Sequence, residues 1–326
     1  MPGKVSPEDL CSVVFSRTGR EDDRVLQGPA DGEDAAAIDV PAGTLVVSSD
    51  PISLAASAVG QLGVHVACND VAASGGEPRW LTVVCLLPSD ADDGMLERIT
   101  GDLDAEARNL GATVVGGHTE VVDALTRPLL SMTAIGTAET FVPTGGAQPG
   151  DRLLLTDGAG IEGTAILAGD FGSELDVDPA IVDRGRRFLD DLSVLPAARV
   201  LRTDATAMHD PTEGGVAAAA HEIARAADVA VTIDRAAVPI EPETDTLCAA
   251  AHVDPLKIFG SGSLLATVPP NAVEGALDRL AEAGIEAAEV GTVEAAPDGP
   301  HLVLDHERIT DPVEDDLFPL WERADT

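Results

Sequence analysis

The polar residues of the first half that are best suited to chemistry lie in four short segments. They are Asp34 in GEDAAAI, Asp50 in SSDP, Asn69 and Asp70 in ACNDVAASGG, and Glu120 in GGHTEV. Asp70 stands in an alanine-rich stretch, where a charge is costly unless it is paired or metal-bound. Mg²⁺ prefers oxygen ligands, usually one or two carboxylates plus nucleotide phosphates. We therefore predict one Mg²⁺–nucleotide site with Asp34, Asp50, Asp70 and Glu120 as metal ligands. For any one segment, an Asx turn or helix cap is the alternative.

The segment VVGGHTEVV, residues 114–122, puts small and polar residues between valines. Gly116 and Gly117 lack a Cβ and let the backbone approach a phosphate closely. Thr119 can donate to a phosphate oxygen, and Glu120 can hold a cation. His118 and Glu120 are the candidate catalytic residues. A strand-to-loop bulge without a ligand is the alternative.

The second half contains MHDPTEGG, residues 208–215, directly before a predicted helix over 214–227. We expect Asp210 or Thr212 to cap that helix. A glycine pair at a helix N-terminus also lets a phosphate reach backbone N–H groups at the positive end of the dipole. A capped helix with no ligand is the alternative.

Two other phosphate motifs carry little weight. No GxxxxGK[ST] loop is present, which excludes a Walker-type site. TDGAGIEG, residues 156–163, contains GxGxxG between a predicted strand and helix, but no ribose-binding acid follows clearly about 20 residues later.

These segments are separated by alternating strand and helix patterns. The first half predicts strands at 44–50, 79–88 and 129–138 and helices at 53–74 and 90–112. The second half predicts helices at 161–169, 179–191, 195–202, 242–252 and 271–283, and strands at 152–157, 263–268, 286–292 and 301–304. The turn-rich VPTGGAQPGD lies between the halves, so we predict α+β domains over 1–148 and 149–326.

The charge of the chain is extreme, with 57 acids against 20 bases and a net charge of −37. The acids are spread along the whole chain, and Lys4 and Lys257 are its only lysines. An even acidic coat favours adaptation to a halophile's cytoplasm, because high net charge keeps proteins soluble in concentrated salt. A protein that mimics or binds a basic partner usually concentrates its charge instead. Without a basic patch, we expect no nucleic-acid binding.

Cysteine usage and hydropathy narrow the class further. The four cysteines are scattered without a CxxC pair, so we expect neither zinc nor disulfides, and four buried thiols. No apolar run approaches the ~18 residues of a membrane span. The start of the chain does not resemble a signal peptide. We expect a cytoplasmic protein that does not bind membranes.

Together the motifs resemble the superfamily of aminoimidazole ribonucleotide (AIR) synthase, thiamine-monophosphate kinase, selenophosphate synthetase and the hydrogenase-maturation factor HypE. The similarity spans nearly the whole chain and is greatest to HypE. GEDAAAI, SSDPIS, CND and GGHTEV carry it in the first half. DRLLLTDGAGIEGTAILA, AMHDPTEGGVAAAAHEIARAADVAVTID and DPLKIFGSGSLLATV carry it in the second.

This resemblance implies a two-domain PurM-like architecture, with a C-terminal α/β sandwich and N-terminal sheets that pair into the barrel of a homodimer. It also implies Mg²⁺-ATP as cofactor and phosphoryl transfer to a small or protein-bound substrate. By the same match Asp34, Asp50, Asn69 and Asp70 contact metal and phosphate. Asp210 and Glu213 join the nucleotide contacts.

Three departures from HypE bear on the reaction. The chain ends in DLFPLWERADT without HypE's C-terminal cysteine, Glu120 stands in place of its lysine, and Ser261 in place of its glutamate. We therefore expect an ATP-dependent enzyme with an unidentified acceptor. Thiamine-monophosphate-kinase-like activity, for which GEDAA is close to the family's GDDAA, is an alternative. A catalytically silent nucleotide-binding maturation or regulatory protein is another.

Overall fold

The computed structural model describes residues 8, 11–12, 22–41, 43–53, 58–92 and 94–324. The chain forms two compact units, each treated by itself below. Unit 2 comprises residues 24–28 and 34–141, and the described part of unit 1 includes 29–33 and 142–324.

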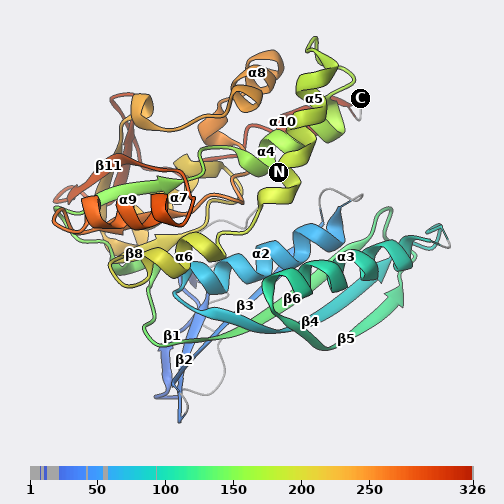
Figure 1. Cartoon of the computed structure of the whole chain (residues 1–326), viewed down its shortest axis with the longest axis horizontal. Helices are drawn as coiled ribbons and strands as arrows, with labels where there is room; N and C mark the ends of the chain where they lie inside the picture. Colours follow the sequence, from blue (N-terminus) through green and yellow to red (C-terminus); the bar gives the residue numbers. More distant parts are fainter. Residues whose placement is uncertain are drawn as a thin grey trace. The chain divides into compact units, whose positions relative to one another are not determined.

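Unit 2 is built on a six-stranded sheet with the order β1-β2-β3-β6-β4-β5 (Figure 1). All neighbours are antiparallel except β4 and β5, which are parallel and form one edge. Its strands are β1 (Val25–Gln27), β2 (Ala36–Val40), β3 (Gly43–Ile52), β4 (Glu77–Leu87), β5 (Thr113–Val121) and β6 (Leu129–Ala138).

Helices α2 (Val59–Ala73) and α3 (Met95–Leu110) cover one face of this sheet (Figure 1). Alternate residues of β4, from Leu81 to Leu87, are buried on that face, as period-2 patterning requires. α2 is made largely of small and apolar residues, and nearly all of it is buried. α3 buries only a stripe of Ile99, Leu103 and Ala107.

The opposite face of the sheet carries exposed apolar residues. Trp80 and Val84 on β4 keep 39% and 37% of their surface exposed. The register places half-buried Ile135 of β6 between Trp80 and half-buried Val47 of β3, so apolar side chains continue across the sheet. This surface, defined by Val47, Trp80, Val84 and Ile135, is called the open face below.

Unit 1 is built on a seven-stranded sheet with the order β13-β12-β9-β11-β7-β10-β8, in which only β12 and β9 are parallel. Its strands are β7 (Arg152–Thr156), β8 (Ala207–His209), β9 (Val229–Ile233), β10 (Leu265–Val268), β11 (Ala287–Ala295), β12 (His301–Leu304) and β13 (Glu307–Ile309). Its α-helices are α4 (Ile161–Ile166), α5 (Pro179–Arg186), α6 (Leu195–Leu201), α7 (Gly215–Ala227), α8 (Pro242–Ala251), α9 (Val273–Glu282) and α10 (Phe318–Ala324).

Short helical turns complete unit 1. They are η2 (Thr144–Gly146), the π-helix η3 (Leu167–Phe171), η4 (Arg187–Asp191), η5 (Arg235–Ala237) and η6 (Pro255–Lys257). The predicted helices at 161–169 and 179–191 are thus each split into an α-helix and a short turn of another type.

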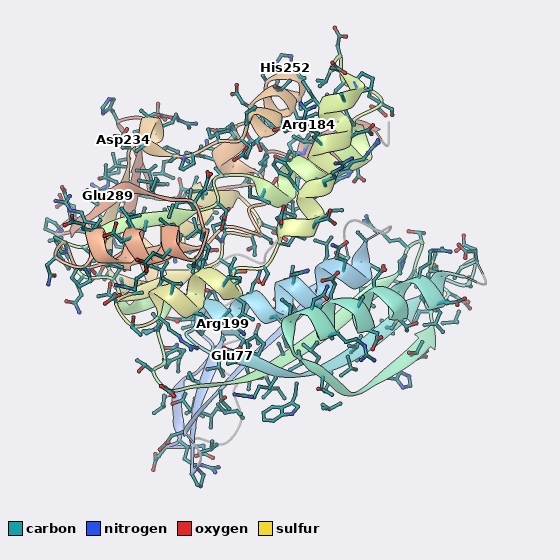
Figure 2. The ribbon with its side chains drawn as sticks, in the orientation of Figure 1. Glu77, Arg184, Arg199, Asp234, His252 and Glu289 are labelled. Atoms are coloured by element: carbon teal, nitrogen blue, oxygen red, sulfur yellow. The ribbon has the colours of Figure 1, made fainter. Side chains whose placement is uncertain are left out.

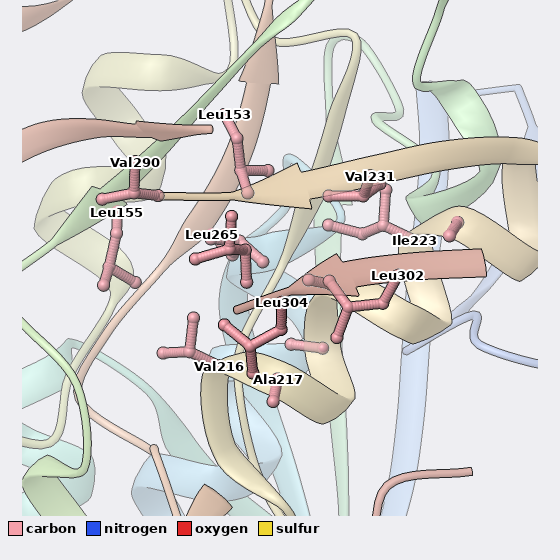
Figure 3. Packing of buried hydrophobic residues seen from close by; sticks show 14 of the residues in the cluster. Leu153, Leu155, Val216, Ala217, Ile223, Val231, Leu265, Val290, Leu302 and Leu304 are labelled. Carbon is pink, nitrogen blue, oxygen red and sulfur yellow. The ribbon is translucent and has the colours of Figure 1, made fainter. Parts of the chain in front are cut away.

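The core of unit 1 lies between α7 and the sheet. Val216 and Ile223 of α7 pack with Leu155, Val231 and Leu302 of the strands (Figure 3). α7 presents a run of alanines, which lets the helix approach the sheet closely. Charged side chains cover the outside of the protein, for example Arg184, Asp234 and Glu289 (Figure 2). None of the described helices is long and apolar enough to cross a membrane.

The predicted α+β class is confirmed, and two strands include polar residues that the sequence analysis treated as site residues. The polar residues of GGHTEV lie inside β5, which continues to Val121. Asp50 likewise lies within β3, two residues before its end. Each strand continues past its polar residues because the backbone there still pairs with the neighbouring strand.

Candidate functional site

The centre of the candidate site in unit 2 is a buried serine that joins two carboxylates. Ser48 Oγ lies 3.0 Å from Asp50 Oδ2 and also donates to Asp70 Oδ2. Asp50 comes from β3 and Asp70 from α2, which packs on that strand. Two acids that are 20 positions apart in sequence are therefore held at one hydroxyl, as converging metal ligands would be.

The serine and one of the two carboxylates are buried. Ser48 and Asp70 are 6% and 7% exposed, and Asn69 is fully buried beside them in α2. Buried carboxylates need hydrogen bonds or a cation to offset their lost hydration. Asp34 is half-buried two residues before β2, and the first residue of β2 pairs with Val47 of β3. The ladder therefore brings Asp34 to the same end of β3 as Ser48 and Asp50.

The edge strand β5 forms one wall of a cleft of about 530 Å³ in unit 2. The cleft is lined by Thr100, Leu103, Asp104, Ala107 and Arg108 of α3, by Val83 and Cys85 of β4, and by Ala112, Thr113, Val114, Gly116, Gly117, His118 and Thr119. It has apolar walls and a few polar groups, which is the usual character of a small-molecule site. Five residues of the segment 114–122 line it.

The two glycines of this segment have different physical roles. A Cβ on Gly117 would stand 1.9 Å from the carbonyl oxygen of Val83, so glycine is required for β5 to pair with β4. A Cβ on Gly116 would meet no atom within 4 Å. Both glycines were predicted to allow close approach of a phosphate. At Gly117, but not at Gly116, strand pairing by itself already requires a glycine.

The register of the sheet separates Glu120 from the serine-linked acids. Asp50, Met132, Val83 and Gly117 form one row across β3, β6, β4 and β5. Paired residues share a face, so Thr119 lies on the helix-covered face, and Glu120 lies on the open face. Three strand spacings, about 14 Å, separate the row's ends. Within one chain, the structure therefore does not bring Glu120 to Asp50.

His118 and Glu120 form an exposed pair on β5. Their Nε2 and Oε2 atoms lie 3.3 Å apart, and both side chains are at least 60% exposed. An exposed pair of this kind contributes little to stability. Its assignment to catalysis remains a prediction.

The segment MHDPTEGG forms the entry to α7 in unit 1, and the expected helix cap was wrong. Neither Asp210 nor Thr212 caps the helix with its side chain. The carboxylate of Asp315, from the end of the chain, accepts the N–H of Gly214 at 2.7 Å. Asp210 is 1% exposed, and Glu213 is half-buried. Sequence reasoning missed Asp315, because 101 residues separate it from the helix that it caps.

A second missed residue is Glu162 at the start of α4. Its burial raises the pKa of the carboxyl to about 7. The glycines of the GxGxxG motif around it serve packing. A Cβ on Gly160 would stand 2.9 Å from Pro255 O, and one on Gly163 would stand 2.7 Å from Ile258.

In GEDAAAI, neighbouring acids have separate roles. Glu33 accepts the N–H groups of Thr144 and Gly145 at 3.1 and 2.9 Å, which caps η2 of unit 1. Asp34 belongs to unit 2.

The cysteines offer no reactive buried thiol. Burial raises the pKa of Cys68 and of Cys248 to about 12 and also raises the pKa of Cys85. Cys11 is exposed, so the expectation of four buried thiols was wrong for this residue.

Comparison with known proteins identifies the family. The N-terminal domain of AIR synthase related proteins matches residues 32–138, and their C-terminal domain matches residues 148–302. The chain belongs to the AIR synthase related protein family. Carbamoyl dehydratase HypE of Cupriavidus necator is 32% identical over 290 residues, which cover 83% of this chain and 79% of the relative. Selenide, water dikinase of Nitratidesulfovibrio vulgaris is 31% identical over 345 residues, covering 92% and 95%.

Solved structures of the family have the same fold. HypE of E. coli superposes with a TM-score of 0.72 at 25% identity, covering 90% of this chain and 94% of that one. A HypE in complex with ATP gives a TM-score of 0.69 at 26% identity, covering 91% and 88%. A thiamine-monophosphate kinase, AaThiL complexed with AMPPCP and TMP, gives 0.71 at 22% identity, covering 85% and 89%, which shows the shared PurM-like fold alone.

Proposed function

We propose that this protein is a Mg²⁺-ATP-dependent enzyme that activates a small or protein-bound substrate by phosphoryl transfer. The observation that carries the proposal is the link through Ser48 between Asp50 and Asp70. Oxygen ligands that converge from a strand and a helix fit Mg²⁺, which neutralises the charge of a transferring phosphoryl group when it is bound. The relatives support ATP as cofactor, since one HypE structure contains it.

The remaining predicted contacts take the following roles. Asp34, Asp50 and Asp70 hold the metal, and Asn69 contacts phosphate. Gly116 and Thr119, which both line the cleft beside β5, are proposed as nucleotide contacts, and the volume of the cleft suits a group of that size. Asp210 and Glu213 are proposed as nucleotide contacts of unit 1.

Hydrolysis or transfer of the γ-phosphate of ATP, measured in molar KCl with and without Mg²⁺, tests this function. Asp70→Asn keeps a hydrogen-bond partner for Ser48 but removes a charge from the pair. We expect at least a tenfold loss of Mg²⁺-dependent turnover. Asp39→Asn is the matched control, since Asp39 is an exposed aspartate on β2, and it should leave turnover unchanged. Equal activity of wild type and Asp70→Asn would refute the assignment.

The same assay separates the alternatives. A catalytically silent protein binds ATP in equilibrium dialysis but never consumes it, whatever acceptor is added. Thiamine-monophosphate-kinase-like activity requires ATP consumption that depends on thiamine monophosphate. The sequence argument for that kinase is the similarity of GEDAA to the family's GDDAA. The structure weakens this argument, because Glu33 of GEDAA caps η2.

We also propose a homodimer formed through the open face of unit 2. An apolar surface that continues across Val47, Ile135, Trp80 and Val84 is costly to leave in water, and a second copy offers the same surface. Trp80→Arg should give a monomer in light scattering. Leu96→Arg is the control, because Leu96 on α3 is also 39% exposed but lies on the helix side of the sheet. A monomeric wild type would disprove the dimer.

A further inference from the structure

One polar row of α3 lies along the cleft beside β5 (Figure 1). Thr100, Asp104 and Arg108 stand four positions apart on α3, and all three line the cleft. Residues four apart on a helix share a face, so these side chains lie on one side of the cleft. The row one position earlier, which includes Leu103 and Ala107, is buried. α3 therefore presents one exposed polar row to the cleft.

Within this row, Asp104 orients Arg108 and leaves most of its donors unused. Arg108 donates from Nε to Asp104 Oδ2 at 2.9 Å, and its side chain is 76% exposed. No other described residue accepts a hydrogen bond from this guanidinium, so both terminal nitrogens are available. Arg98 of the same helix differs, because its Nη1 and Nη2 both donate to Asp92, at 3.1 and 2.7 Å. Arg108 is thus held in place with its plane open to a ligand.

The lining of the cleft has balanced charges and no aromatic side chain. Among the described residues that line it, Asp104 and Arg108 carry the only permanent charges, and these cancel. None of these lining residues is Phe, Trp or Tyr. His118 also lines the cleft, but it pairs with Val84 and so carries its ring on the open face. In this set, Arg108 is therefore the one side chain that can stack on a ring from the helix-covered face.

A nucleotide in this cleft would meet it with the base rather than with the phosphates. On the proposed function, the phosphates follow the metal that Asp50 and Asp70 hold. The ladder separates Asp50 from Gly117 of β5 by three strand spacings, about 14 Å. A lining whose charges cancel gives a triphosphate no net attraction, whereas apolar walls such as Leu103 and Val83 suit the faces of a base.

We propose that Arg108, held by Asp104, stacks on the base of ATP and forms the base platform of the cleft. This inference rests on the proposed function, since it takes ATP as the ligand. The planar guanidinium of arginine stacks on aromatic rings, and every nucleobase has a π face that accepts such a contact. Asp104 is a positioning residue, because its bond to Nε orients the guanidinium.

The affinities for ATP and for inorganic triphosphate, each with Mg²⁺, separate the base from the phosphates. Isothermal titration calorimetry on the full-length protein in molar KCl measures both. Arg108→Gln removes the guanidinium at an exposed helix position, so the melting temperature should stay unchanged. We expect this variant to bind ATP about tenfold more weakly and to bind triphosphate within about twofold of wild type.

Two further variants decide what Arg108 contributes. Arg98→Gln removes the other ion-paired arginine of α3, which does not line the cleft, and should leave both affinities unchanged. Arg108→Lys keeps the charge but not the plane and should weaken ATP binding severalfold.

Four results would overturn the base platform alone, in a wild type that binds ATP. They are unchanged ATP affinity in Arg108→Gln, an equal loss of triphosphate affinity in that variant, an equal loss in Arg98→Gln, and full ATP affinity in Arg108→Lys. A wild type that does not bind ATP would overturn the proposed function and the platform with it, so the two failures are distinguishable.

Discussion

Substitutions in β5 allow stability and ligand binding to be tested separately. In Gly117→Ala the new methyl would stand 1.9 Å from Val83 O, far inside van der Waals contact. The φ angle of Gly117, +157°, is also one that side chains rarely adopt. β5 must therefore move away from β4 or lose part of its ladder. In Gly116→Ala the methyl meets no atom within 4 Å and, because Gly116 pairs with Thr82, projects on the open face of the sheet.

The magnitude follows from three costs. Overpacking costs about 1–3 kcal/mol, backbone strain about 1–3 kcal/mol, and each lost hydrogen bond about 1 kcal/mol. An edge strand can relax, and a movement that relieves overpacking or strain breaks hydrogen bonds instead, so the three costs do not add in full. We expect Gly117→Ala to lower the free energy of unfolding by about 3 kcal/mol. At about 4 °C per kcal/mol, the melting temperature of unit 2 falls by roughly 12 °C. Gly116→Ala should change stability by less than about 0.5 kcal/mol.

Calorimetry in molar KCl measures the first effect, and equilibrium binding of ATP with Mg²⁺ measures the second. Thr119→Val should weaken ATP binding severalfold at unchanged melting temperature, because it removes a hydroxyl from the residue that lines the cleft on the helix-covered face. Equal melting temperatures for the two glycine variants would refute the account of strand pairing. Unchanged ATP affinity in Thr119→Val would refute the placement of the nucleotide in this cleft.

Three further outcomes are expected. Burial lowers the pKa of His65 below its ordinary value of 6.5, although Glu106 Oε2 lies 3.2 Å from its Nε2. The stability that depends on the neutral imidazole is therefore lost as the pH falls below 6.5. In urea titrations between about pH 7 and 5, the His65→Gln variant should lose less stability than wild type. Two guanidinium nitrogens of Arg235 donate to the two carboxylate oxygens of Asp254, at 2.9 and 2.7 Å. Arg235→Lys should lower the free energy of unfolding by about 1 kcal/mol, because a lysine cannot make both bonds. An unchanged free energy of unfolding would count against the bidentate pair. Iodoacetamide at pH 8 should label Cys11 quickly and the three buried cysteines only after unfolding, and mass spectrometry that found rapid labelling of Cys68 would contradict its raised pKa.

The sequence by itself determined the class of fold and most of its long elements. Apolar alternation in β4 and β6, the amphipathic pattern of α3 and the glycine that ends it at Gly111 are local signals, and the structure follows them. The motifs also indicated the family that the comparisons then showed. Local patterns suffice here because the period of burial is set by each element's own geometry.

The tertiary structure decided how the polar residues are grouped. Only the packing of α2 on β3 shows that Ser48 joins Asp50 to Asp70, and only strand register shows that Glu120 lies on the other face of the sheet. Asp315 reaches Gly214 across 101 positions, and no local pattern predicts such a contact. A side chain's partners depend on which elements meet in space, and residue spacing along a single element carries no information about them.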